Sequence, residues 1–123
     1  MSLLKRIFGI TDKKQPFHLD DGNFEAEVLT ATMPVLVDVW GPSCGPCKQL
    51  EPIIMDLAAR YDGRVKVCEL SAAASPRASM LLRIQHTPTV LYFLEGRELE
   101  RIPGFRSSLF HEQTIQEHFG IDP

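Results

Sequence analysis

Two cysteines separated by two residues are the clearest candidates for chemistry in this chain. Cys44 and Cys47 enclose Gly45 and Pro46, and this spacing brings two sulfur atoms within disulfide range. An apolar run precedes the pair and a helical pattern follows it, so it lies at a predicted strand-to-helix turn. Unpaired amides and the helix dipole favour a thiolate at Cys44, whereas Cys47 lies one turn inside the helix. This asymmetry suits an exchange in which Cys44 attacks a disulfide and Cys47 resolves the mixed disulfide.

A metal or iron–sulfur site is the alternative interpretation of the same two cysteines. Such a site needs two further ligands, for which Cys68 and the four histidines are available. Their spacing matches no compact metal motif, and Lys48 stands where haem attachment requires a histidine. The sequence therefore favours a redox pair, and we expect no metal and no other cofactor.

Asp38 is the second candidate for a chemical role. It interrupts the apolar run from 35 to 40, where a charge is costly to bury. Burial raises the pKa of a carboxyl group, so Asp38 could accept the proton of Cys47 near neutral pH. The alternative is a structural carboxylate that is paired or lies at the end of a strand.

Hydrophobic periodicity predicts the elements that must position these side chains. We expect strands at 35–40, at 65–70, at 89–94 and from the turn at 95–96 to about 102. We expect helices between 22 and 33, from 46 to about 61, from 76 to about 82 and from 108 to 119. Ser75 and Ser107 are the predicted N-caps of the last two helices, and Gly120 ends the last one. Its expected apolar contacts are Leu109, Phe110 and Ile115. Strand–helix alternation followed by a hairpin predicts an α/β fold, a central mixed β-sheet flanked by helices on both faces.

Composition and charge restrict the classes of protein to which the chain can belong. Its 123 residues, 44% hydrophobic and 24% charged, fit one globular domain. A net charge of -3 gives no electrostatic case for nucleic-acid binding. No apolar stretch reaches the roughly 20 residues that span a bilayer, and the apolar segment after Arg6 is too short for a secretion signal. Three cysteines argue against a secreted disulfide scaffold. We therefore expect a cytoplasmic monomer without stable membrane insertion.

Residues 1–12 form a predicted N-terminal extension that precedes the domain at 13–123. Leu3, Leu4, Ile7 and Phe8 have a spacing that would place them on one face of a short amphipathic helix. The simple interpretation is a frayed tail or a short helix resting on the domain. The alternative is a helix that docks on a membrane surface or a partner, flanked by Lys5 and Arg6.

Taken together, these residues resemble the thioredoxin family over about residues 13–120. The residues that carry the resemblance, in order and with matching spacing, are Asp38, Trp40, Cys44, Gly45, Pro46, Cys47, Lys48, Pro52, Thr87, Pro88, Thr89, Gly96 and Gly104. The resemblance implies a thioredoxin fold, with Cys44 as nucleophile, Cys47 as resolving thiol and Asp38 as proton acceptor. It implies that Pro88 is cis and packs beside the disulfide. It also implies a substrate groove made of Trp40, Gly41, Pro42, Thr87, Pro88 and Gly104, where the Thr87 backbone would pair with a substrate strand.

The activity implied by this resemblance is reduction of protein disulfides, with an NADPH-dependent thioredoxin reductase as electron donor. Several positions depart from the family pattern: Ser43 replaces a tryptophan, Glu69 replaces a lysine near the buried aspartate, His86 and Thr87 replace a small and an aliphatic residue, and Pro103 precedes Gly104. If Glu69 approaches Asp38, its charge should raise a carboxyl pKa, and His86 could lie beside the thiols. Ser43, Glu69 and the N-terminal extension motivate the alternative of a non-catalytic, thioredoxin-like protein-binding module. Cys68 is expected to be a buried strand residue that acts as a small hydrophobe.

Overall fold

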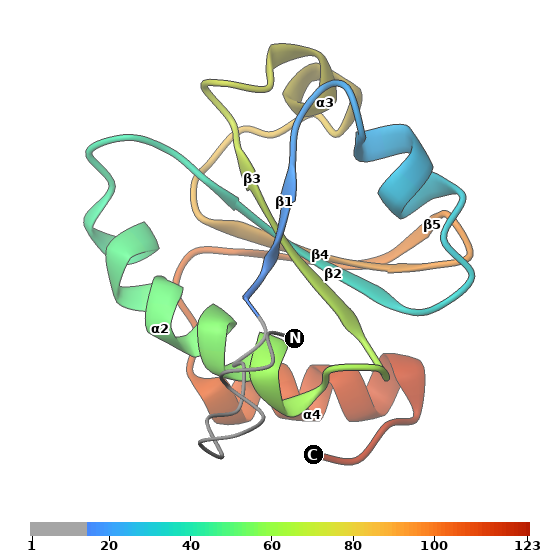
Figure 1. The fold of residues 1–123 in the computed structure, drawn as a ribbon. Helices are drawn as coiled ribbons and strands as arrows, with labels where there is room; N and C mark the ends of the chain where they lie inside the picture. The colour runs from blue at the N-terminus through green and yellow to red at the C-terminus, as the bar shows by residue number, and fades with distance from the viewer. Residues whose placement is uncertain (1–14) are drawn as a thin grey trace, which may run out of the picture.

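The computed structural model describes residues 15–123 of the chain, and its centre is one five-stranded sheet (Figure 1). The strands are β1 (Phe17–Leu19), β2 (Val35–Trp40), β3 (Lys66–Ser71), β4 (Thr89–Leu94) and β5 (Arg97–Pro103). Their order across the sheet is β1-β3-β2-β4-β5. β3 runs parallel to both β1 and β2, whereas β4 is antiparallel to β2 and β5. The predicted mixed sheet is therefore confirmed.

In the described part of the chain, four helices cover the two faces of this sheet (Figure 1). They are the π-helix η1 (Glu25–Leu29) and the α-helices α2 (Gly45–Arg60), α3 (Pro76–Leu81) and α4 (Ser108–Phe119). Residues of η1 and α3 pack in one apolar core, and residues of α2 and α4 pack in the other. None of the helices within residues 15–123 is long and apolar enough to cross a membrane. The expected extension at 1–12 lies outside the described residues.

The central strand β2 supplies side chains to both cores. Val35, Val37 and Val39 belong to the core on the η1 and α3 side, and Leu36 belongs to the core on the α2 and α4 side. Successive side chains of a strand point to opposite faces. Asp38 therefore shares the face of Leu36 and points toward α2.

The predicted bounds of β2 and β4 are confirmed, but other features of the fold differ from expectation. β1 was not predicted, because three residues are too few to display a strand period. Leu109 is 61% exposed, so its predicted apolar contact is wrong. The predicted contacts of Phe110 and Ile115 are confirmed. The buried face of α4 carries His111, Thr114 and Ile115, at i, i+3 and i+4 spacing. His111 is fully buried, and its imidazole hydrogen-bonds the Tyr92 hydroxyl across the α4–β4 contact.

The two predicted serine caps have different outcomes. The Ser107 hydroxyl accepts a hydrogen bond from the Phe110 amide at 3.1 Å, which confirms the cap of α4. Ser75 stands at the N-cap position of α3 but makes no capping bond, and its buried hydroxyl has no partner within residues 15–123. The Asp21 carboxylate accepts instead from the amides of Arg77 at 3.1 Å and Ala78 at 2.8 Å. Helix α3 is therefore capped by a residue of a distant loop.

The two candidate caps of α3 give a direct stability test. Asp21→Ala should lower the free energy of unfolding by about 1–2 kcal/mol, since two helix amides lose a charged acceptor. Ser75→Ala should change it by less than about 0.5 kcal/mol, because no hydrogen bond is lost. Urea denaturation of both variants measures the difference. A larger loss for Ser75→Ala than for Asp21→Ala would contradict the assignment of the cap.

Candidate active site

Cys44 and Cys47 are held at the junction between β2 and α2. Cys44 is the N-cap residue of α2, Cys47 lies in its first turn, and the two sulfurs form a disulfide with a Cα–Cα separation of 5.2 Å. Cys44 is half-buried, whereas Cys47 is 7% exposed. The Cys47 amide donates a hydrogen bond to Cys44 Sγ at 3.2 Å. A substrate can therefore reach Cys44 more readily than Cys47, as the spacing predicts.

The start of α2 also favours negative charge on Cys44. Its first turn contains no acidic residue, and the N-terminal end of a helix stabilises an anion through its free amides and its dipole. Together with the Cys47 amide, this lowers the free energy of a Cys44 thiolate relative to its thiol. Thr87 O lies 3.5 Å from Cys44 Sγ, where it could accept a hydrogen bond from the reduced thiol. The arrangement thus suits nucleophilic attack by Cys44.

Several predicted groove residues meet beside Cys44 although they come from three separate segments. The Thr87–Pro88 peptide bond is cis, as the resemblance implies, and Pro88 is buried. The Pro88 carbonyl oxygen accepts from the Gly104 amide at 2.8 Å. A Cβ atom on Gly41 would lie 2.9 Å from Thr87 Oγ1, so a side chain there would displace Thr87. These contacts bring the end of β2, the start of β4 and the end of β5 to one place.

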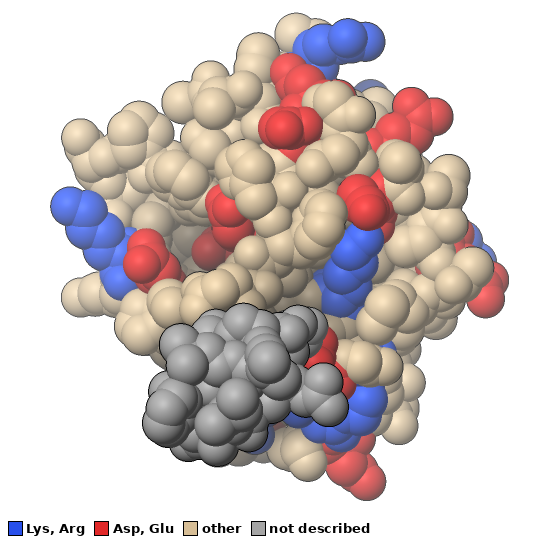
Figure 2. Space-filling model, in the orientation of Figure 1, with Lys and Arg blue, Asp and Glu red and all other residues tan. Residues whose placement is uncertain are grey.

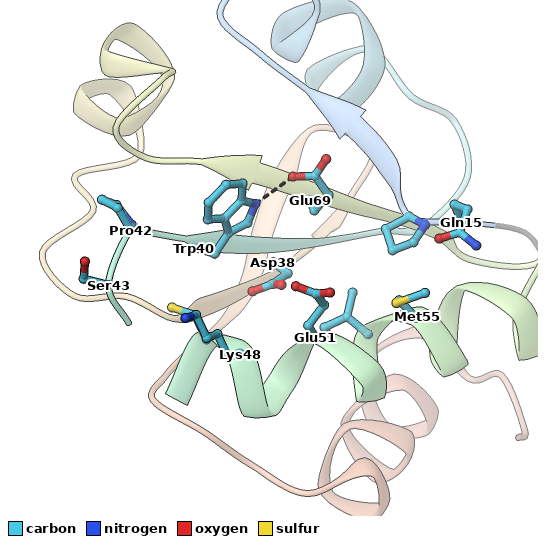
Figure 3. A pocket seen from close by; sticks show the side chains of 13 residues that line it. Gln15, Asp38, Trp40, Pro42, Ser43, Lys48, Glu51, Met55 and Glu69 are labelled. Carbon is cyan, nitrogen blue, oxygen red and sulfur yellow. Dashed lines mark hydrogen bonds between the residues drawn. The ribbon is translucent and has the colours of Figure 1, made fainter. Parts of the chain in front are cut away.

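The other two predicted groove residues, Trp40 and Pro42, line a cleft on the α2 side of the same loop (Figure 3). This cleft also reaches Asp38 and Cys47. Ser43, the residue before Cys44, has a positive φ of 52°, a conformation that non-glycine residues adopt rarely. The role of each of these residues in substrate binding stays a prediction.

Asp38 is buried behind the cysteine pair, with only 5% of its surface exposed. Its Oδ1 atom has no hydrogen-bond partner within residues 15–123. Burial and, to a smaller extent, the nearby charges of Glu69 and Glu51 together raise the pKa of Asp38 to about 7. The predicted burial and the predicted raised pKa are both confirmed. Near neutral pH this carboxyl group can therefore both take up and release a proton.

Glu69 does approach Asp38, and it connects two further residues to the site. The two acids are in register on the adjacent strands β2 and β3. One Glu69 oxygen accepts a hydrogen bond from Trp40 Nε1 at 2.7 Å (Figure 3). The other Glu69 oxygen lies 2.6 Å from His18 Nδ1. The hydrogen bond and charge of Glu69 raise the pKa of His18 above its usual value of 6.5. Nothing in the sequence indicates the His18 contact, because it depends on the unpredicted pairing of β1 with β3.

Two candidates remain, His86 and Cys68. The His86 side chain is exposed, and the hydrogen bonds of Cys44 Sγ within residues 15–123 are with Thr87 O and the Cys47 amide. Cys68 is fully buried in β3, and burial raises the pKa of its thiol to about 12. It therefore behaves as the small hydrophobe predicted above. Within residues 15–123, no three His, Cys, Asp or Glu side chains come together in a way that could hold a metal ion.

Comparisons with known proteins agree with this geometry. The family model named Thioredoxin matches residues 15–117. Thioredoxin 1 of Nostoc sp. is 33% identical over 98 residues, which cover 80% of this chain and 92% of that protein. Thioredoxin of Synechocystis sp. is 34% identical over 100 residues, covering 81% and 94% respectively. The chloroplastic thioredoxin M2 of Arabidopsis thaliana is 37% identical over 86 residues, which cover 70% of this chain and 46% of that protein.

The contact between Glu69 and Asp38 can be tested with a change that keeps the Trp40 hydrogen bond. Glu69→Gln removes the negative charge, but its amide oxygen can still accept from the indole. We expect the pKa of Asp38 to fall from about 7 by roughly half a unit to one unit, since a like charge is lost. NMR titration of the Asp38 carboxyl carbon measures this change in pKa.

Glu69→Leu is the matched control, because it removes the charge and the hydrogen-bond acceptor together. We expect it to lower the pKa of Asp38 as well, and also to shift the indole N–H signal of Trp40, the single tryptophan of the chain. If the pKa of Asp38 stayed unchanged in both variants, the charge of Glu69 would not contribute to that pKa.

Proposed function

Because the chain belongs to the thioredoxin family and is a thiol–disulfide oxidoreductase, we propose that it reduces disulfides in partner proteins. The observation that carries this proposal is the bond between a half-buried Cys44 at the start of α2 and a buried Cys47, with Asp38 buried behind them. A partner reaches one sulfur, and the second sulfur is kept close enough to complete the reaction. This is the asymmetry that a two-step exchange requires.

In the first step, the Cys44 thiolate attacks one sulfur of the partner's disulfide. A bond forms between Cys44 Sγ and that sulfur, the partner's S–S bond breaks, and the released thiolate takes a proton from water. The Cys47 amide and the N-terminal end of α2 support the attacking thiolate. The product is a mixed disulfide between Cys44 and the partner.

In the second step, Cys47 transfers its thiol proton to Asp38 and attacks Cys44 Sγ. The mixed disulfide breaks, the second partner sulfur leaves as a thiolate, and the Cys44–Cys47 disulfide forms. Two electrons have then passed from the dithiol to the partner. Asp38 suits the role of proton acceptor because it borders the same cleft as Cys47 and has a pKa of about 7.

The groove around Thr87 is the proposed docking place for the partner's backbone. Thr87 O lies beside Cys44, and Pro88 and Gly104 fix the adjoining segments. A partner strand that pairs with the Thr87 backbone would hold its disulfide against Cys44. The proposed binding residues are Trp40, Gly41, Pro42, Thr87, Pro88 and Gly104.

The oxidised pair must be reduced again before another cycle can start. We propose an NADPH-dependent thioredoxin reductase as the electron donor and the cytoplasm as the compartment. The three cysteines of the chain support this compartment, because two form the redox pair and the third is buried and unpaired. A reducing compartment keeps such isolated thiols intact and regenerates the dithiol.

Serine variants of the two cysteines test the order of the steps. Cys44→Ser should abolish dithiothreitol-dependent reduction of insulin, because the attacking sulfur is gone. Cys47→Ser should stop turnover but accumulate a mixed disulfide with insulin, visible on a non-reducing gel. Turnover by Cys44→Ser would contradict the assignment of the nucleophile. Partner capture by the double variant, with no reduction by the wild type, would favour the non-catalytic binding module.

Asp38→Asn tests the proton acceptor. In the wild type, the carboxylate fraction rises with pH through about 7, so resolution of the mixed disulfide should accelerate from about pH 6 to about pH 8. The variant should resolve about 10- to 100-fold more slowly at about pH 8 and lose that part of the pH dependence. Stopped-flow kinetics separates this step from the attack by Cys44, which should change much less. Unchanged resolution over this pH range would exclude the proposed role.

A further inference from the structure

A cleft of about 410 Å³ lies between α2 and the ends of β2 and β3 (Figure 3). Three carboxylates line it: Asp38 of β2, Glu51 of α2 and Glu69 of β3. Figure 2 shows acidic side chains gathered inside a hollow on this face of the molecule. Its walls also include Trp40 and Met55, so acidic groups and apolar surface adjoin each other in one cavity.

The carboxylates of this cleft retain unused hydrogen-bond acceptors. Asp38 is 5% exposed, and its Oδ1 atom has no partner within residues 15–123. Within residues 15–123, the Glu51 side chain takes part in no ion pair and in no side-chain hydrogen bond. Glu69 is bonded to Trp40 and His18, but each carboxylate oxygen can accept more than one hydrogen bond. A buried acceptor without a partner is costly, so a donor that entered the cleft would be favoured.

The arrangement of acidic and apolar groups in the cleft favours an organic cation over a metal ion. Within the described residues, no three acidic, His or Cys side chains come together closely enough to hold one metal ion. A guanidinium or ammonium group carries several donors and can serve acceptors that do not converge on one point. The apolar surface of Met55 and the indole of Trp40 suit the hydrocarbon stem that precedes such a group.

We propose that this cleft binds the cationic head of an arginine or lysine side chain on the partner whose disulfide is reduced. The inference rests on the proposed function, since it makes the acidic cleft a specificity site for the same reaction. The cleft is bordered by Pro42, Ser43 and Cys47, which flank Cys44 in the chain. A partner bound to Cys44 through its own cysteine can therefore place a nearby side chain in the cleft. Arginine fits better than lysine, because its planar fork can bond two carboxylates at once.

Occupation of the cleft would also act on the proton acceptor. The pKa of Asp38 is raised by burial and by its acidic neighbours, and a positive charge close by favours the ionised form instead. A cationic partner would thus increase the fraction of Asp38 that is ready to accept the proton of Cys47. Other charged groups at the cleft are Lys48, Glu51 and Glu69, with His18 bonded to the far side of Glu69.

Paired disulfide peptides test the proposal. Each peptide carries arginine at one position within three residues of its cysteine, and its twin carries the uncharged analogue citrulline there. We expect kcat/KM for the arginine peptide to exceed that of its twin by about 10-fold at one or more positions. In Glu51→Gln/Glu69→Gln the ratio should fall to within about twofold. The matched control is Glu25→Gln/Glu117→Gln, which loses the same charge at exposed sites outside the cleft and should keep the wild-type ratio.

The outcomes separate this inference from the proposed function. Equal rates for all twins, or a ratio that survives Glu51→Gln/Glu69→Gln, would overturn the cleft as a cation site while leaving disulfide reduction intact. Failure to reduce any peptide or insulin would overturn the proposed function itself. Free agmatine shows whether the cleft binds a free cation or the side chain of a partner. If agmatine lowered the Asp38 pKa but no arginine peptide gained rate, the cleft would be a site for free amines and the partner side chain would be excluded.

Discussion

The burial of the Asp38 carboxylate on the central strand is the constraint on which the rest of the active site depends. An ionised carboxylate in this position is costly, because one of its oxygens has no partner within residues 15–123 and its strand is covered on both faces. The cost is reduced because the Asp38 carboxyl group, with a pKa of about 7, is partly protonated near neutral pH. A stable core would gain from an apolar residue here. The proposed proton transfer from Cys47 gives a reason for an acidic residue at this buried position.

The order of strands explains why the reactive groups meet. β2 ends at Trp40, and the loop that follows leads directly to Cys44 at the start of α2. Because β4 runs antiparallel to β2, its first residue, Thr89, pairs with Val39 at the same end of the sheet. The Thr87–Pro88 segment therefore lies next to the cysteine loop. The parallel neighbour β3 places Glu69 opposite Asp38 on the other side. A groove and an acidic cleft consequently flank one thiol pair.

Glu69 gives the cleft part of its acidic character and connects it to the neighbouring strands. Glu69 adds a negative charge beside Asp38, and it is also the hydrogen-bond partner of Trp40 and His18. One carboxylate thus connects the edge strand β1, Trp40 and Asp38. Its charge acts on the proton affinity of Asp38, and its hydrogen-bond acceptor holds the indole of Trp40. The surroundings of the thiol pair are therefore coupled to the charge and hydrogen bonds of a single residue.

The sequence by itself determined the features that neighbouring residues encode. The apolar runs defined β2 and β4, Ser107 and Gly120 marked the ends of α4, and the position of Asp38 within an apolar strand indicated its burial. Periodicity and capping are local properties, and they can be recognised in one segment without knowledge of the others.

Only the tertiary structure decided which distant residues meet. His18 reaches Glu69 across 51 positions of the chain, and Asp21 caps α3 across 57. His111 is buried in the core beside Tyr92, whereas Leu109 is exposed to solvent. Each of these outcomes depends on strand order or on the rotation of a helix against the sheet. Those quantities are set by the packing of the whole core, so no single segment specifies them.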